Sequence, residues 1–237
     1  IYQQSKEEKK MSEKAKKYAV VLSGCGVFDG SEIHEAVSLL IALDNAGAAY
    51  QCFAPNSWQA RTVDHYTGQA TAVAGDDDNR NVLAESARIA RGNIKDLSAF
   101  SVRDFDGVLF PGGMGAAMNL SNFAEQGAAC DVHEEVARVL NEAYDAGLVI
   151  GAMCIAPAVV ARVLGRHHIK ITLGSDPQTA AGIEKTGAIH ENQPADGVCI
   201  DAAHRIFTTP AYMSATKISE VARGAERLVA ACTGAGS

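Results

Sequence analysis

The stretch Val149-Ile150-Gly151-Ala152-Met153-Cys154-Ile155-Ala156-Pro157 decides how this chain can fold. The apolar run 148–150 predicts a short buried strand and residues 158–164 predict a helix, with Cys154 at the junction. A side chain on so sharp a turn is exposed at the carboxyl edge of a sheet, beside free helix N–H groups that favour a thiolate. Cys154 is therefore a candidate nucleophile. The alternative is a small apolar residue that closes a core turn.

The composition is that of an ordinary globular domain. Of the 237 residues, 47% are hydrophobic, which is enough for one sizeable core. A net charge of -7 argues against a nucleic-acid partner, and no apolar run approaches the about 20 residues needed for membrane insertion. The six cysteines form no CxxC pair. The sequence therefore predicts neither a disulfide framework nor a metal site, and it favours a reducing compartment.

The first residues of the chain differ from the rest because they are almost wholly polar. Such a segment cannot contribute to a core, so we predict a disordered or extended tail over 1–17 and a single domain over 18–237. The tail is a candidate for docking to a larger protein assembly. If Ile1 is a processed N-terminus, the protein belongs in the mitochondrial matrix, and if Met11 is the natural start, a cytoplasmic location follows.

Apolar runs and helical spacings alternate along the domain, which predicts a mainly parallel sheet with helices on both faces. The polar segment 56–79 is expected to be a loop or a hairpin. Strands are predicted over 18–22, 49–54, 107–110, 148–150, 169–173, 198–201 and 205–208. Helices are predicted over 32–45, 81–91, 131–146, 158–164 and 214–231, and also near 115–125 and near 177–186. Ser31 is the predicted N-cap of the first helix.

Two glutamates open the first predicted helix. Glu32 and Glu35 are three residues apart and share a helix face, so at least one of them can face a cleft at the end of the first strand. Glu35 is the better candidate for proton transfer beside a thiol. The alternative is that both residues only stabilise the positive end of the helix dipole.

A glycine pair follows the strand at 107–110. In Pro111-Gly112-Gly113 the glycines allow a tight turn that presents N–H groups to an oxyanion. The spacing fits neither a P-loop nor a dinucleotide fingerprint, so we exclude nucleotide binding. No histidine adjoins Cys154, and His34 is expected to point away from Glu35, so the sequence alone reveals no full triad.

Five segments in the same order closely resemble the ElbB-type family, also called the enhancing-lycopene-biosynthesis or isoprenoid-biosynthesis glyoxalase family. It belongs to the PfpI/deglycase superfamily, which has a class I glutamine amidotransferase-like fold. The resemblance runs from Tyr18 to the C-terminal helix. The five segments are 21–36, 80–92, 110–124, 153–158 and 208–213. The first contains Ser-Gly-Cys-Gly-Val-Phe-Asp-Gly-Ser-Glu, and the third begins with Phe-Pro-Gly-Gly-Met-Gly. The last two are Met-Cys-Ile-Ala-Pro-Ala and Thr-Thr-Pro-Ala-Tyr-Met.

The resemblance implies an α/β fold, a flavodoxin-like three-layer sandwich with the nucleophile elbow at Cys154. Glu35 matches the superfamily's glutamate, and Glu32 is the second choice. The remaining candidates are the oxyanion-hole residues Gly112, Gly113 and Ile155 and the substrate-binding residues Asn119, Asp176 and Arg88. Arg88 is a candidate for binding a product carboxylate, with a solvated helix face as the alternative.

Two positions depart from the superfamily pattern. Ile155 stands where many amidotransferase and protease relatives have a histidine directly after the cysteine, and Asp176 precedes Pro177 where the deglycases have a histidine. Both differences argue against ammonia-generating glutaminase chemistry.

The resemblance implies a cofactor-independent glyoxalase, whose Cys154 and Glu35 convert glyoxal or methylglyoxal to glycolate or lactate without glutathione or metal. The alternative is a catalytically weak or inactive protein that acts as a redox-sensing or assembly subunit. Superfamily relatives commonly dimerise, so a homodimer is expected by analogy.

Overall fold

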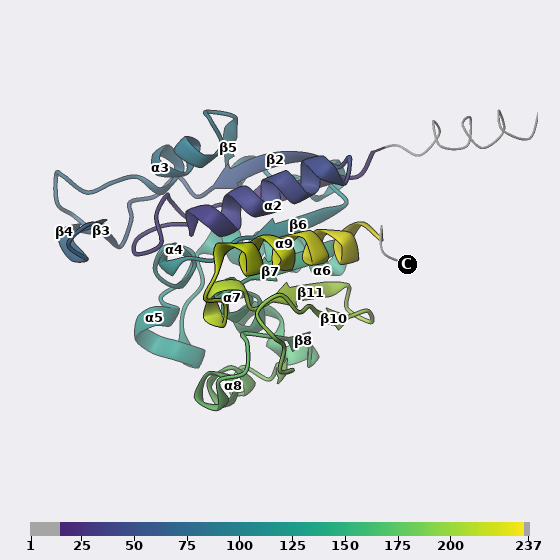
Figure 1. Ribbon diagram of the computed structural model, residues 1–237. Helices are drawn as coiled ribbons and strands as arrows, with labels where there is room; N and C mark the ends of the chain where they lie inside the picture. The colour runs from purple at the N-terminus through teal and green to yellow at the C-terminus, as the bar shows by residue number, and fades with distance from the viewer. Residues whose placement is uncertain (1–14, 235–237) are drawn as a thin grey trace, which may run out of the picture.

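The computed structural model describes residues 15–234, which form a seven-stranded sheet covered by helices (Figure 1). The strand order is β10-β11-β7-β6-β1-β2-β5, and every neighbouring pair is parallel except β10 and β11. Two small sheets, β3-β4 and β8-β9, lie outside it. The strands are β1 (Lys17–Val21), β2 (Ala49–Ala54), β3 (Arg61–Asp64), β4 (Gln69–Val73), β5 (Ile94–Asp96), β6 (Gly107–Phe110), β7 (Val149–Met153), β8 (Lys170–Ile171), β9 (Ile189–His190), β10 (Cys199–Asp201) and β11 (Ile206–Thr209).

Helices cover both faces of the sheet, as the alternating pattern predicts. Helices α2 and α9 lie side by side on one face (Figure 1), and α6 and α7 pack on the other. The helices are α2 (Ile33–Asn45), α3 (Val82–Ile89), α4 (Met114–Met118), α5 (Phe123–Gln126), α6 (Glu134–Asp145), α7 (Ala156–Leu164), α8 (Pro177–Glu184) and α9 (Ile218–Thr233).

Strand β1 shows how the two layers are built. Tyr18 and Val20 belong to the core beneath α2 and α9, whereas Ala19 and Val21 belong to the core beneath α6 and α7. Successive strand residues point to opposite faces, so a central strand covered on both sides is apolar at every position. All of β7 is likewise buried, which is why it appears in the sequence as a continuous apolar run.

The predicted fold class is confirmed, with five local corrections. Strands β5 and β9 were not predicted, because segments of three and two residues carry too little periodicity, and the helix expected near 115–125 is two short helices, α4 and α5. Strand β8 pairs with β9 instead of joining the central sheet. The N-cap of α2 is Glu32, whose side chain accepts from the N–H of Glu35, while Ser31 Oγ accepts from the N–H of Ser23.

The predicted tail extends too far into the domain. Lys17 is the first residue of β1, and its N–H donates to Asp106 Oδ2 at 2.7 Å. Lys16 Nζ donates to the carbonyl oxygen of Thr233 at the end of α9. The domain therefore begins before residue 18, and residues 1–14 of the predicted tail lie outside the described part of the chain.

Candidate active site

Cys154 occupies the elbow between β7 and α7. Its backbone φ is +58°, a conformation that residues other than glycine adopt at an energetic cost. Its N–H donates to the carbonyl oxygen of Thr209 at 3.0 Å. The predicted strand, turn and helix are therefore present. The side chain is less accessible than expected, because Cys154 is only 7% exposed.

Glu35 lies in the first turn of α2 and is completely buried. Its Oε2 accepts a hydrogen bond from the N–H of Gly112 at 2.9 Å, and its Oε1 accepts one from the N–H of Tyr212 at 3.2 Å. The carboxyl group also forms a hydrogen bond with the side chain of Cys154. Three segments that are distant in the sequence thus meet at one carboxyl group, at the carboxyl ends of β6, β7 and β11.

Burial raises the cost of ionising both side chains. Burial raises the pKa of Glu35 to about 7, against the hydrogen bonds from Cys154, Tyr212 and Gly112. Burial also raises the pKa of Cys154 well above its usual value, and the charge of Glu35 adds to this. The expected thiolate stabilisation by the helix N-terminus is therefore outweighed. Because the groups are coupled, they share protons as a pair, and a thiolate is most accessible when Glu35 is neutral.

The oxyanion-hole candidates divide into two kinds. The N–H groups of Gly113 and Ile155 form hydrogen bonds to the Cys154 sulfur, so they face the reacting position. The N–H of Gly112 is already bound to Glu35. Gly112 therefore positions the acid, which corrects its assignment as an oxyanion donor.

The second glutamate supports the first. Glu32 Oε2 accepts from the N–H of Glu35 at 2.7 Å, and its Oε1 lies 3.8 Å from Nδ1 of His34. The same His34 Nδ1 lies 2.8 Å from the hydroxyl of Tyr212. Sequence reasoning singled out neither the hydroxyl nor the N–H of Tyr212. Its only signal was its place within the segment 208–213 that carries the family resemblance.

Asn119 does not fit its expected role in substrate binding. Its Nδ2 donates to the carbonyl oxygens of Ser23 and Asp29, both at 2.8 Å, and its Oδ1 accepts from the N–H of Ala60 at 2.9 Å. The side chain is buried and these three bonds use most of its capacity. Asn119 therefore joins the loop after β1 to the segment before β3.

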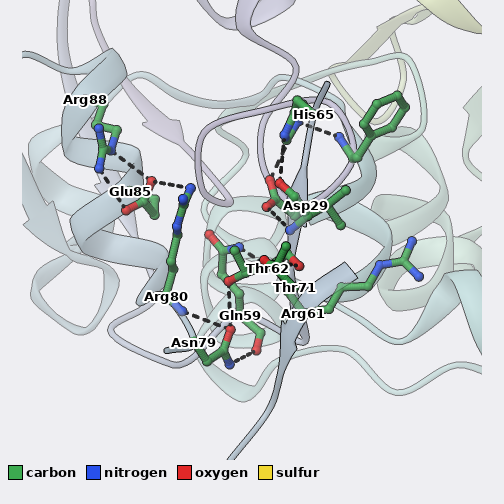
Figure 2. Close-up of polar contacts among 12 residues, drawn as sticks. Asp29, Gln59, Arg61, Thr62, His65, Thr71, Asn79, Arg80, Glu85 and Arg88 are labelled. Atoms are coloured by element: carbon green, nitrogen blue, oxygen red, sulfur yellow. Dashed lines mark hydrogen bonds and ion pairs between the residues drawn. The ribbon is translucent and has the colours of Figure 1, made fainter. Parts of the chain in front are cut away.

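Arg88 and Asp176 have local partners instead of contacts with Cys154. The Nε of Arg88 lies 2.9 Å from Glu85 Oε2, and Figure 2 shows Arg80 and Arg88 both turned toward Glu85. The Arg88 side chain is 66% exposed, as the solvated-face alternative predicts. Asp176 caps α8 and accepts from the N–H and the hydroxyl of Thr179 at 2.7 Å.

The segment 56–79 contains the hairpin β3-β4, one of the two expected possibilities. Figure 2 shows how the loop after β1 holds it: Asp29 Oδ2 accepts from the N–H of Val63 at 2.8 Å, and His65 Nε2 accepts from the N–H of Phe28 at 3.2 Å. The hairpin is thus bound to the loop between β1 and the helix that carries Glu35.

Three further properties concern the described part of the chain. No cluster of three or more His, Cys, Asp or Glu side chains within residues 15–234 is arranged to hold a metal ion. All six cysteines are free thiols. None of the helices in this range has both the length and the apolar character required to cross a membrane.

A parallel sheet with a cysteine elbow and a buried glutamate beside it defines a class I glutamine amidotransferase-like domain. The crystal structure of an isoprenoid biosynthesis protein with an amidotransferase-like domain from Ehrlichia chaffeensis superimposes with a TM-score of 0.84 and 36% identity, over 92% of this chain and 99% of that one. Drosophila melanogaster DJ-1beta, at 18% identity and a TM-score of 0.54 over 93% and 92% of the two chains, shares the fold.

The sequence relatives give the family. Human glutamine amidotransferase-like class 1 domain-containing protein 3, mitochondrial, is 42% identical over 91% of this chain and 81% of its own length. The rat ES1 protein homolog, mitochondrial, is 40% identical over 89% of this chain and 80% of its own length. The chain therefore belongs to the family of these ES1 and amidotransferase-like class 1 proteins. No protein-family profile matches it.

Proposed function

We propose that this protein is a glyoxalase that uses neither glutathione nor a metal, with Cys154 as nucleophile and Glu35 as proton carrier. One observation carries the proposal: a fully buried carboxyl group is hydrogen-bonded to the elbow thiol, and its pKa is raised to about 7. A carboxyl group with this pKa can both accept and release a proton near neutral pH.

The proposed reaction begins when Glu35 takes the proton of Cys154 and the thiolate adds to the aldehyde carbon, C1, of methylglyoxal. Glu35 returns that proton to the new alkoxide, which gives a hemithioacetal. As a carboxylate again, Glu35 removes the hydrogen of C1 as a proton and delivers it to C2, while the hydroxyl proton passes from the C1 oxygen to the C2 oxygen. The product is a lactoyl thioester on Cys154. Water hydrolyses it to lactate and restores the thiol.

Two backbone groups support the charged intermediates. The N–H groups of Gly113 and Ile155 bond to the Cys154 sulfur and therefore lie next to any oxygen on the carbon that the sulfur attacks. Donors at such positions stabilise an alkoxide more than a neutral carbonyl oxygen. Glyoxal would follow the same steps and yield glycolate.

The test is loss of methylglyoxal and formation of lactate by purified protein without glutathione. We expect Cys154→Ala and Glu35→Gln each to lower turnover by at least about 100-fold. Cys25→Ala, which removes a half-buried thiol in the loop after β1, is the matched control and should keep wild-type turnover. Equal background rates in the wild type and both site variants would exclude the glyoxalase.

A second candidate function is a redox-sensing or assembly subunit. The raised pKa of Cys154, caused by burial and by Glu35, favours the catalytically weak or inactive form of this alternative, because a thiol that rarely ionises is a weak nucleophile. In that case methylglyoxal is not consumed. The redox-sensing role additionally requires that peroxide oxidise Cys154 to sulfenic or sulfinic acid before the other cysteines, which mass spectrometry would detect, and the absence of such preference would leave the assembly role.

We infer the finer placement in the ElbB-type family from the five sequence segments together with the isoprenoid biosynthesis protein of Ehrlichia chaffeensis, whose structure is similar at 36% identity. We also propose a mitochondrial location, in the matrix, because the human and rat relatives are named as mitochondrial. Protease protection in intact mitochondria, lost only when the inner membrane is permeabilised, would establish the matrix. Recovery in the cytosolic fraction would contradict it.

We further propose a homodimer formed through α2 and α9. Ile33, Val37 and Ile41 recur every four residues on the exposed side of α2, and with Ile218 of α9 they line a groove of about 330 Å³. The lining contains no Lys, Arg, Asp or Glu, so a two-fold contact brings no like charges together. In light scattering, Ile41→Glu should turn a dimer into a monomer, whereas Ile189→Glu on β9 should not. A monomeric wild type would refute the homodimer.

A further inference from the structure

One side-chain hydrogen bond joins the two elements that meet at Glu35. The Nδ1 of His34 lies 2.8 Å from the hydroxyl of Tyr212, although the residues are 178 positions apart. His34 directly precedes Glu35 in α2, and Tyr212 lies in the 3₁₀ turn η5 (Ala211–Met213) after β11. The bond therefore connects the first turn of the helix that carries the acid with the turn that donates to the acid.

The backbone of the same tyrosine completes a closed ring. The N–H of Tyr212 donates to Glu35 Oε1 at 3.2 Å, so its main chain holds the carboxyl while its side chain holds the preceding residue. The turn needs such support, because Ala211 has φ +44° and is fully buried. A non-glycine residue keeps a positive φ only where surrounding contacts over-determine it.

We propose that His34 and Tyr212 are positioning residues for Glu35: their side-chain bond holds the Tyr212 N–H on Oε1 and keeps the carboxyl directed at Cys154. The inference deepens the proposed function and rests on it only in taking Cys154 and Glu35 as the reacting pair.

The expected effect follows from what surrounds the carboxyl group. Burial is the main reason that the pKa of Glu35 is raised, and Glu32 at the N-cap of the same helix adds to it, while the Cys154 side chain and the N–H groups of Tyr212 and Gly112 lower it. An N–H that donates to a carboxylate stabilises the anion. When the Tyr212 donor is held less firmly, the Glu35 anion loses stability, and the first proton leaves the Glu35–Cys154 pair at a higher pH.

The test is the pH dependence of Cys154 alkylation by iodoacetamide, measured by mass spectrometry of the peptide that contains it. We expect Tyr212→Phe, which removes only the hydroxyl, to move the lower inflection upward by about half to one pH unit. His34→Leu should do the same. His34→Asn retains a hydrogen-bonding atom near the position of Nδ1 and should restore the wild-type profile. Tyr50→Phe, at an exposed tyrosine near the start of β2, is the control.

Two results would overturn the proposal. In the first, the profiles of Tyr212→Phe and His34→Leu superimpose on that of the wild type. In the second, His34→Asn shifts the inflection as far as His34→Leu, which would show that the hydrogen bond is not what matters. Alkylation requires no aldehyde turnover, so a wild type that fails to consume methylglyoxal would refute the proposed function and still leave this test decisive.

Discussion

The backbone N–H of Gly112 donates a 2.9 Å hydrogen bond to Oε2 of Glu35, across 77 positions of sequence. A glycine is required at this point. A Cβ on Gly112 would lie 2.4 Å from the Cβ of Cys154 and 2.6 Å from Glu35 Oε2. The missing side chain is thus what lets the turn after β6 approach the acid and the nucleophile together.

The first prediction concerns this close approach. Gly112→Ala should separate Glu35 from Cys154, because the added methyl group must displace one of them. We expect the rate of Cys154 alkylation by iodoacetamide to change by about 10-fold or more, and the free energy of unfolding to fall by about 1–3 kcal/mol. The alkylation rate and urea unfolding measure the two effects.

Gly182→Ala is the matched control for that substitution. Gly182 lies within α8, where an added Cβ meets nothing within 4 Å. Alanine is favoured over glycine inside a helix, so this variant should be as stable as the wild type or more stable. If Gly112→Ala behaves like Gly182→Ala, the close approach is not needed.

The second prediction follows from the raised pKa of Glu35. The carboxyl group titrates at 4.5 in the unfolded chain and at about 7 in the folded one, so between these values the folded state binds more protons. The free energy of unfolding should therefore fall as the pH rises from 4.5 to 7, by about 3 kcal/mol, and then level off.

Glu35→Gln lacks this titration and is the reference for the measurement. Urea unfolding of both proteins at pH 5, 6, 7 and 8 should show the stability difference, wild type minus variant, decreasing with pH up to about 7. Parallel stability profiles would contradict a buried carboxyl group with a raised pKa.

The third prediction separates a structural role from substrate binding at Asn119. Asn119→Ala leaves two buried carbonyl groups and one partly buried N–H group without their partners, so the free energy of unfolding should fall by about 2–4 kcal/mol. Hydrogen exchange at the amide of Val63 in β3 should accelerate, while the KM for methylglyoxal stays within about twofold. Asn141→Ala loses two hydrogen bonds, one to the Ala137 carbonyl and one from Arg166, and should cost less. A large rise in KM with unchanged stability would restore the substrate role.

The fourth prediction concerns Arg88, whose guanidinium is exposed and bound to Glu85. Arg88→Ala should change the free energy of unfolding by less than about 1 kcal/mol, because Arg80 still lies 3.6 Å from Glu85 and exposed ion pairs contribute little. Inhibition of turnover by added lactate should be unchanged. Weaker lactate inhibition in the variant would instead show that Arg88 binds the product carboxylate.

Local sequence was enough to predict most of the secondary structure. The apolar runs of β1, β6 and β7 are buried on both faces, so each is continuous and easily recognised. The segments that were misjudged are short: β5 has three residues, and β8 has two and leaves the central sheet. Segments this short contain too few side chains to show the alternation of a strand, and the strand with which they pair depends on the tertiary structure.

The sequence by itself determined the elbow, because the strand, the turn at Cys154 and the helix are encoded within a few neighbouring residues. It also placed Glu35 in the first turn of α2. Only the tertiary structure decided the chemistry of the pair. Burial raises the pKa of Glu35 and of Cys154, although the N-terminus of a helix favours a thiolate. The backbone hydrogen bonds to Glu35 come from Gly112 and Tyr212, which are 77 and 177 positions away. Desolvation and long-range donors arise when the layers pack together, so no local pattern of residues can reveal them.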